Sequence, residues 1–345
     1  MTDQQLISVI NMAETYNIGE IATRVSEDIF EYFRWNIHPA TNQNFACLND
    51  DHKTAGGSKK QTHPTDVVFY YDDPYLGRKI YLNTDLKSYG RSSINPSTLR
   101  NALRSLAISV QCASASDEWR TRHVVDVSEP YEVRGLLFLH NHDHDFKHDL
   151  AETMRRIDVS ALPIAENTYL HVLGPLDINR LYSVANDLSR LLQRKEISDD
   201  YTFYYPDLVL WRRHGEVWGQ AATVETLNAP YCVVKHNGTE KGKPGYVIYY
   251  NRPGDSAMEF EYFLDSLSRL QLLDKDAQVR VRVSHKQPSD QIQSNFLVAK
   301  HRYSRAWGFE ATRAATLDAI KLEHVVAVTD NYSPAKLGWR DGENE

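Results

Sequence analysis

The chain has 345 residues, 41% of them hydrophobic and 25% charged, and a formal net charge of -7 at pH 7. This composition is typical of a globular protein and excludes a disordered chain or one embedded in a membrane. The negative balance also argues against a surface that is a polycation throughout for nucleic acid. At roughly 150 residues per domain, the length predicts two domains.

The cysteines and the first residues bear on the cellular compartment. Cys47, Cys112 and Cys232 are far apart and form no Cys-x-x-Cys pair. We therefore expect neither a disulfide framework nor a zinc knuckle, and free thiols are typical of a reducing cytoplasm. The chain begins without a basic segment followed by an apolar one, and no run approaches the roughly 18 apolar residues of a membrane span. A cytoplasmic protein without a membrane partner is expected.

The first elements alternate between helices and a hairpin. Apolar residues at helical spacing predict an amphipathic helix over 18–35, with carboxylates on its outer face. Glycines, lysines and a proline predict a loop over 50–65. Two β-branched and aromatic runs, 66–73 and 78–89, are joined by a turn-forming segment and predict an antiparallel hairpin. A helix over 92–112 follows, with Pro96 near its start.

Further elements are predicted on both sides of a polar boundary. The first half continues as strand 133–140, helix 145–157, strand 168–175 and helix 177–194. A polar stretch then predicts a domain boundary, giving domains 1–196 and 197–345. In the second half we expect one helix and five strands, at 259–273 for the helix and at 201–213, 216–227, 229–237, 245–254 and 278–284 for the strands.

The charged residues of the predicted hairpin form the sharpest candidate site. Asp66 begins its first strand, and Asp85-Leu86-Lys87 lies in its second. Side chains two positions apart share a face, so Asp85 and Lys87 should point the same way while Leu86 points into the core. Since the strands pair, Asp66 can lie opposite, and two carboxylates would converge on a hard cation such as Mg²⁺ beside the lysine. Phosphodiester hydrolysis needs these groups.

With the elements around them, these residues resemble the PD-(D/E)xK nuclease superfamily, which has the restriction-endonuclease-like fold. The resemblance spans roughly residues 10–195 and rests on Pro64-Thr65-Asp66, on Asp85-Leu86-Lys87 and on the preceding helix. Thr65 separates Pro64 from Asp66, and aspartate replaces the commoner glutamate at position 85. The resemblance implies an α/β protein with an αβββαβ core and a second α+β domain.

The resemblance also implies roles for individual residues. Asp66 and Asp85 would be metal ligands, the Leu86 carbonyl a further ligand, and Lys87 the catalytic lysine. Glu20 looks like the helix glutamate that many members use in the site, so it would complete the metal ligands. Glu27, seven residues on and on the same face, is the substitute.

The implied activity is hydrolysis of DNA phosphodiester bonds, as an endonuclease or exonuclease dependent on Mg²⁺ or Mn²⁺. Stand-alone nucleases of this superfamily resemble components of prokaryotic antiphage defence systems, which often pair the nuclease with a second subunit. A second protein subunit or a homodimer is therefore an expected partner besides DNA, and the second domain would serve recognition or assembly. The alternative is a non-catalytic nucleic-acid-binding or scaffold subunit that keeps the fold.

Other charged and metal-binding residue types offer weaker hypotheses. Asp85 and Lys87 could be a solvated ion pair on an exposed sheet face. The histidine-rich segment 140–145 could bind zinc in a different hydrolase, although a polar loop capped by an aspartate is the stronger interpretation. Basic residues that could contact the DNA backbone are Lys59 and Lys60 in the glycine-containing loop and Arg280 and Arg282 in a late strand.

Overall fold

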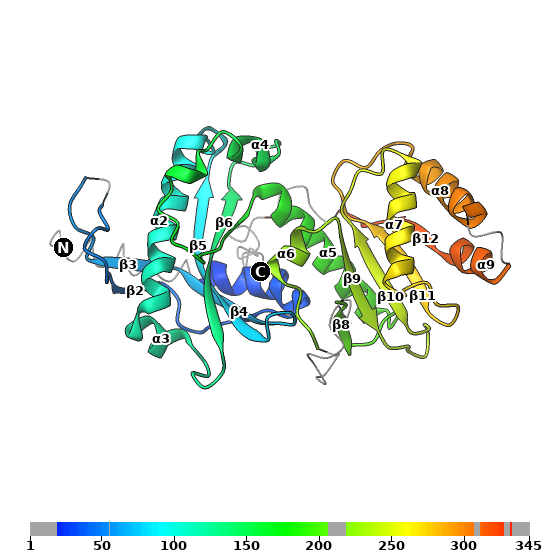
Figure 1. Cartoon of the computed structure of the whole chain (residues 1–345), viewed down its shortest axis with the longest axis horizontal. Coiled ribbons are helices and arrows are strands. Elements are labelled where there is room, and N and C mark those ends of the chain that lie inside the picture. Colours follow the sequence, from blue (N-terminus) through cyan, green and yellow to red (C-terminus); the bar gives the residue numbers. More distant parts are fainter. Residues whose placement is uncertain (1–18, 55, 206–218, 307–310, 328–331, 333–345) are drawn as a thin grey trace, which may run out of the picture. The chain divides into compact units, whose positions relative to one another are not determined.

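The computed structural model describes residues 19–54, 56–205, 219–306, 311–327 and 332. Contacts divide the chain into two compact units, Met1–Asn179 with Asp330–Glu345 and Arg180–Thr329. Each unit has its own five-stranded sheet (Figure 1). The contacts separate the units inside helix α5 (Pro175–Gln193), so the division 1–196 and 197–345 stays a prediction.

The N-terminal helix covers 19–28, and a 3-10 turn, η1 (Phe30–Phe33), follows it. Ala22, Val25 and Ile29 are buried, as the predicted helical spacing requires. The helix ends at 28 rather than at the expected 35, because the chain tightens into η1 and reverses at Arg34, whose φ is 61°. This turn stacks the ring of Phe30 on that of Trp35.

A mixed sheet forms the centre of the first unit. The two strands of the predicted hairpin, β4 and β5, lie in the middle of the sheet and pair antiparallel. The strands on the far side of β5 run parallel to it, because helices connect them across the sheet face. The strands in sheet order are β1 (Asn36–Ile37), β4 (Val67–Asp73), β5 (Arg78–Tyr89), β6 (Tyr131–Asn141) and β7 (Leu170–Leu173).

Helix α2 (Pro96–Ala115) joins β5 to β6 and packs its apolar face on the sheet (Figure 1). Asn95 caps the helix by accepting bonds from two backbone amides of the first turn, and Pro96 occupies the first position, which needs no amide donor. Along the chain, the N-terminal helix is followed by three strands of this sheet, β1, β4 and β5, then by α2 and by β6. This is the αβββαβ order. The predicted α/β fold class with a restriction-endonuclease-like core is confirmed.

Several short elements of the first unit escaped the sequence analysis. Strands β2 (Gln43–Ala46) and β3 (Thr62–Thr65) form a separate two-stranded sheet, so the last four residues of the expected loop 50–65 are a strand. Helix α3 (Asp117–His123) follows α2, and α4 (Leu150–Met154) is shorter than the expected 145–157 because a polar loop precedes it. The 3-10 turns η2 (Arg91–Ser93) and η3 (Val159–Ala161) complete this unit.

The second unit is built on another mixed sheet, in the order β12-β11-β10-β9-β8. Of the expected strand over 216–227, residues 216–218 lie outside the described part of the chain and the rest is wrong: 219–223 is irregular, and Thr223 caps helix α6 (Val224–Asn228). Of the expected strand 201–213, residues 206–213 lie outside the described part of the chain. The elements are β8 (Tyr201–Phe203), β9 (Tyr231–His236), β10 (Gly245–Tyr250), α7 (Ala257–Arg269), β11 (Gln278–Val283), α8 (Ile292–Ala306), α9 (Ala311–Ala319) and β12 (Lys321–His324).

The two sheets have the same connectivity. In each sheet, the strands lie side by side in the order in which they occur in the sequence. The first two pairs of neighbouring strands are antiparallel and the last two pairs are parallel. Helix α7 joins β10 to β11 as α2 joins β5 to β6, and α8 and α9 precede β12 as α4 precedes β7. The second unit therefore repeats the αβββαβ order of the first.

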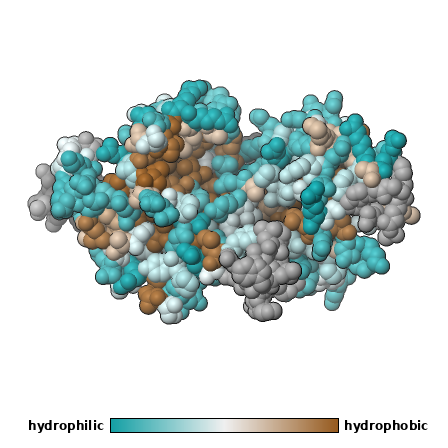
Figure 2. Space-filling model, viewed as in Figure 1, coloured by the Kyte–Doolittle hydropathy of each residue, from teal (hydrophilic) through white to brown (hydrophobic). Residues whose placement is uncertain are grey.

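Hydrophilic residues cover most of the face shown in Figure 2, with hydrophobic residues gathered over part of the first unit. Within the part of the chain that the structure describes, each helix is too short or too polar to cross a membrane.

Candidate active site

The predicted site lies where hairpin β4–β5 ends. Val67 pairs with Thr84, so Asp66 and Asp85 follow in register at the end of the ladder. The carboxylate of Asp66 accepts a hydrogen bond of 2.8 Å from the backbone amide of Leu86. This bond turns Asp66 toward β5, and the side chains of Asp85 and Lys87 form an ion pair of 2.6 Å beside it. The hairpin thus brings together the three charged residues that the sequence singled out.

Burial and mutual repulsion shape the charges of this site. Burial and the adjacent charge of Asp85 raise the pKa of Asp66 to about 6, although the Leu86 amide opposes the shift. Burial lowers the pKa of Lys87, but the charges of Asp85 and Asp66 outweigh it and the net shift is upward. The Asp85 side chain is 18% exposed and that of Lys87 36%, so the alternative of a fully solvated surface pair does not describe them.

A small pocket beside the carboxylates is walled by the hairpin and by α2. Asp66, Asp85 and Ser109 are among its lining residues. Behind it, the side-chain carbonyl of Asn83 accepts from the Thr65 hydroxyl at 2.8 Å, and its amide donates to Ser109 at 3.2 Å. This buried network ties β3, β5 and α2 together, which fixes the position of Asp66. Neither Asn83 nor Ser109 was predicted, since a lone polar residue in an apolar run is no specific signal.

Glu20 lies exposed in the first described turn of the N-terminal helix. A Cβ added to its neighbour Gly19 would stand 3.1 Å from the hydroxyl of Thr41, and the next amide, that of Asn42, donates to the Asp66 carbonyl. The start of the helix therefore lies against the segment that leads into Asp66. Glu27, two helical turns further on, is about 10 Å away along the axis. Neither glutamate is hydrogen-bonded to Asp66 or Asp85, so the role of Glu20 stays a prediction.

With this geometry in place, the chain can be compared with known families. Residues 12–177 match the family model of the GAPS4 protein PD-(D/E)XK nuclease domain. This segment belongs to the PD-(D/E)XK nucleases. No curated protein and no solved structure matches the chain. The matched segment contains the N-terminal helix, the hairpin with its acidic residues and α2, and we refer to it below as the nuclease domain.

Of the two lysines predicted to contact DNA in the nuclease domain, only Lys60 lies close to the site. It is half-buried, and its charge interacts with those of Asp85 and Lys87, while burial lowers its pKa. Lys59 is exposed and pairs with Asp50. Contact between Lys60 and a phosphate beside the carboxylates stays a prediction, which this interaction of charges supports.

Arg280 and Arg282, the basic residues predicted outside the nuclease domain, are paired with carboxylates. Arg280 binds Glu196 at 2.7 Å, and Arg282 binds the buried Asp187 and also Glu323. Their charges are compensated within the second unit. Phosphate contact there stays a prediction that has less support than contact at Lys60.

The histidine-rich segment 140–145 comprises the end of strand β6 and the polar loop that follows it from His142. The Ser88 hydroxyl lies 3.3–3.4 Å from Nδ1 of both His140 and His142, and Asp143 accepts bonds from the backbone amides of Arg91 and Asp145. The converging group of potential metal ligands in the described chain lies elsewhere, at Cys47, His52, His63 and Cys112. No Cys-x-x-Cys pair takes part in this group, so the expectation of no zinc knuckle stays a prediction.

Proposed function

We propose that the nuclease domain hydrolyses DNA phosphodiester bonds with a divalent cation, Mg²⁺ or Mn²⁺. The convergence of Asp66, Asp85 and Lys87 at the end of the hairpin supports this activity most directly. Glu20 and the Leu86 carbonyl complete the proposed ligand set. Carboxylate and carbonyl oxygens are the ligands that these hard cations prefer.

The electrostatics of the site fit a cation. Burial raises the pKa of Asp66, the charge of Asp85 raises it further, and Lys87 forms its ion pair with Asp85. A divalent ion between the carboxylates would relieve the repulsion between their charges. When bound, it would polarise the phosphate and acidify a water molecule.

The protein's own groups have separate tasks in this proposal. The Leu86 amide holds the Asp66 carboxylate in one orientation, so the ligand is positioned before any ion arrives. The Lys87 ammonium, held by Asp85, orients the attacking water or stabilises the negative charge that develops on the phosphate oxygens. Lys60 supplies a second positive charge nearby and would bind an adjacent phosphate of the strand.

GAPS4 is an antiphage defence component, and we infer that this chain acts in a prokaryotic defence system in the cytoplasm. A second protein subunit or a second copy of the chain would restrain or direct the nuclease. The second unit would then serve recognition or assembly. This step rests on family analogy.

The activity can be tested with purified protein on linear and circular DNA, with and without Mg²⁺, alone and together with the product of the neighbouring gene. We expect cleavage that needs the metal and that the Lys87→Ala variant loses. Cleavage of linear DNA alone would identify an exonuclease. A scaffold role would instead be supported if Asp85→Ala and Lys87→Ala chains protected cells from phage as well as the wild type does.

A further inference from the structure

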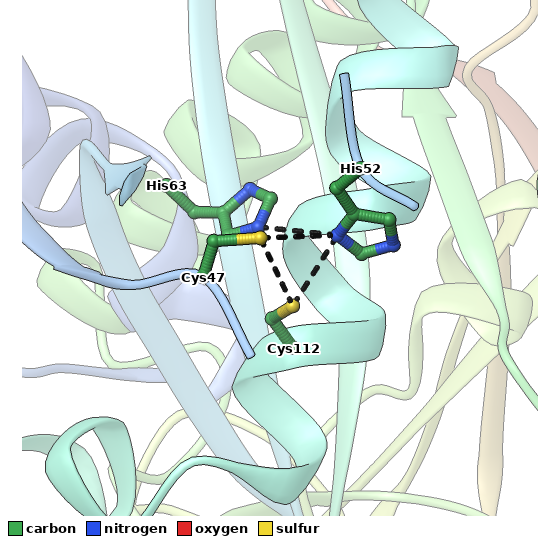
Figure 3. A group of neighbouring side chains, drawn as sticks. All are labelled: Cys47, His52, His63 and Cys112. Atoms are coloured by element: carbon green, nitrogen blue, oxygen red, sulfur yellow. Dashed lines mark hydrogen bonds between the residues drawn. The ribbon is translucent and has the colours of Figure 1, made fainter. Parts of the chain in front are cut away.

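Four side chains that the proposed nuclease chemistry does not use point toward one another (Figure 3). Cys47 follows β2, His52 lies in the loop after it, His63 is in β3, and Cys112 is in α2. One ligand atom from each lies within 4.8 Å of all the others. All but the half-buried Cys47 are buried.

The separations match a tetrahedral ion. Nδ1 of His52 lies 3.4 Å from the sulfur of Cys47, 3.4 Å from that of Cys112 and 3.4 Å from Nε2 of His63. The two sulfurs are 4.0 Å apart. Zinc bonds of about 2.3 Å to sulfur and about 2.0–2.1 Å to nitrogen place tetrahedral ligand atoms about 3.3–3.8 Å from one another. A disulfide, with sulfurs about 2.05 Å apart, is not formed here.

We propose that Cys47, His52, His63 and Cys112 bind one structural Zn²⁺ ion. Two thiolates and two imidazoles fill all four tetrahedral positions, which is typical of structural rather than catalytic zinc. Both thiols lose their protons on binding, and both histidines bind as neutral rings. Soft sulfur with imidazole selects zinc over the hard cation assigned to the carboxylates.

A neighbouring side chain orients one of the ligands. Nε2 of His52 lies 2.9 Å from the side-chain carbonyl of Gln111, so the Nε2–H can donate to it. That bond leaves the lone pair of Nδ1 directed at the two sulfurs. Metal-bound histidines commonly have such a partner on the other ring nitrogen. Gln111 adjoins Cys112 on α2, so a single helix turn supplies one ligand and orients another.

Hydrogen bonds hold the loop between β2 and β3 to itself: the Cys47 amide donates to the Gln61 carbonyl, and the Lys60 amide to that of His52. Most of its residues are exposed, and Leu48 is 55% exposed. An ion bound by three residues from this side and by Cys112 would clip the loop to α2. Lys60 lies in the same loop, so the ion would also keep that lysine beside Asp85; this consequence rests on the proposed nuclease function, whereas zinc binding does not.

The test is the metal content of full-length protein, purified without chelator and measured by inductively coupled plasma mass spectrometry. We expect about one zinc per chain in the wild type and a loss of at least tenfold in a Cys47→Ala/Cys112→Ala variant. Cys232→Ala is the matched control, because Cys232 is buried in β9 of the second unit, and it should keep the zinc. A wild type without zinc, or a double variant that retains it, would overturn the proposal.

Two readouts on the wild type do not depend on the folding of variants. Replacing the metal with Co²⁺ should give the visible absorption of tetrahedral cobalt with thiolate-to-metal charge transfer, and octahedral cobalt spectra would contradict the site. Mass spectrometry without reductant should find Cys47 and Cys112 as free thiols. A Cys47–Cys112 disulfide as the main species would also overturn the proposal.

Discussion

The two units share a strand order and differ at the end of the central hairpin. In the first, Asp85 follows Thr84, the partner of Val67; in the second, Asn251 follows Tyr250, the partner of Tyr231. By this register Pro230 stands where Asp66 does, and Pro253 where Lys87 does. The connectivity sets up a place for a site, and the side chains at that place decide whether chemistry occurs.

The units also differ in how they balance buried charge. Asp187 of α5 is fully buried, and Arg282 and Arg190 bind it while Tyr249 donates to it at 3.1 Å. This carboxylate is compensated in full by protein groups. At the nuclease site two carboxylates face one directly paired lysine, which leaves a place for a cation. The first arrangement should serve stability and the second function.

The largest effect should follow from removing the lysine of the nuclease site. Lys87→Ala should lower the rate of DNA cleavage by about 10²–10³-fold or more, because an electrostatic stabiliser aimed at the reacting group is lost. Asn251→Ala, at the position in the second unit that corresponds to Asp85, should cleave at the wild-type rate. Single-turnover kinetics on one DNA substrate would compare them. Equal losses in both variants would contradict the division of roles between the units.

The reverse holds for the buried ion pair of the second unit. Asp187→Ala should lower the free energy of unfolding by about 3–5 kcal/mol, because Arg282 would lose its buried partner and keep only the exposed Glu323. Asp85→Ala should cost less than about 1 kcal/mol, since Lys87 can reach water. Urea unfolding of both variants gives the two values. A larger loss for Asp85→Ala would reverse our assignment of structure and function.

The raised pKa of Asp66 predicts a gain in stability when its charge is removed. A folded-state pKa of about 6 against a usual 3.8 means that the folded protein binds this proton more tightly, so stability is lost as the pH rises between these values. In metal-depleted buffer, Asp66→Asn should be more stable than the wild type by about 3 kcal/mol at pH 7.5 and nearly equal to it near pH 4. Unfolding curves across this range test it; a variant that is less stable at pH 7.5 would contradict it.

The smallest effect concerns the two neighbouring lysines of the loop between β2 and β3. Lys60→Ala should weaken DNA binding by about tenfold, because a phosphate contact near the carboxylates is lost, and should reduce the salt dependence of binding. Lys59→Ala should change neither, since its ammonium faces solvent and Asp50. Fluorescence anisotropy at several salt concentrations would measure the DNA affinity of both variants. Equal losses of affinity would contradict a phosphate contact at Lys60.

The hairpin and its site could be predicted because their signals are local. Asp85 and Lys87 share a face by the period of a strand, and Asp66 follows from the pairing of adjacent strands. The cluster around Cys47 could not be predicted, because its fourth ligand, Cys112, comes from a helix distant in sequence and no short spacing marks it. A strand was predicted over 216–227 because its apolar residues fit either period, and the cap at Thr223 decided for a helix from Val224 on.

The central claim is that only the first hairpin holds a catalytic cation. Its most direct test is the rate of DNA cleavage as Mg²⁺ is added to wild-type and Asp66→Asn protein, in metal-depleted buffer rather than chelator, which would also remove zinc. We predict no cleavage without Mg²⁺, a saturable rise in the wild type and no rise in Asp66→Asn. Cleavage without a divalent cation, or an Asp66→Asn variant as active as the wild type, would contradict the claim.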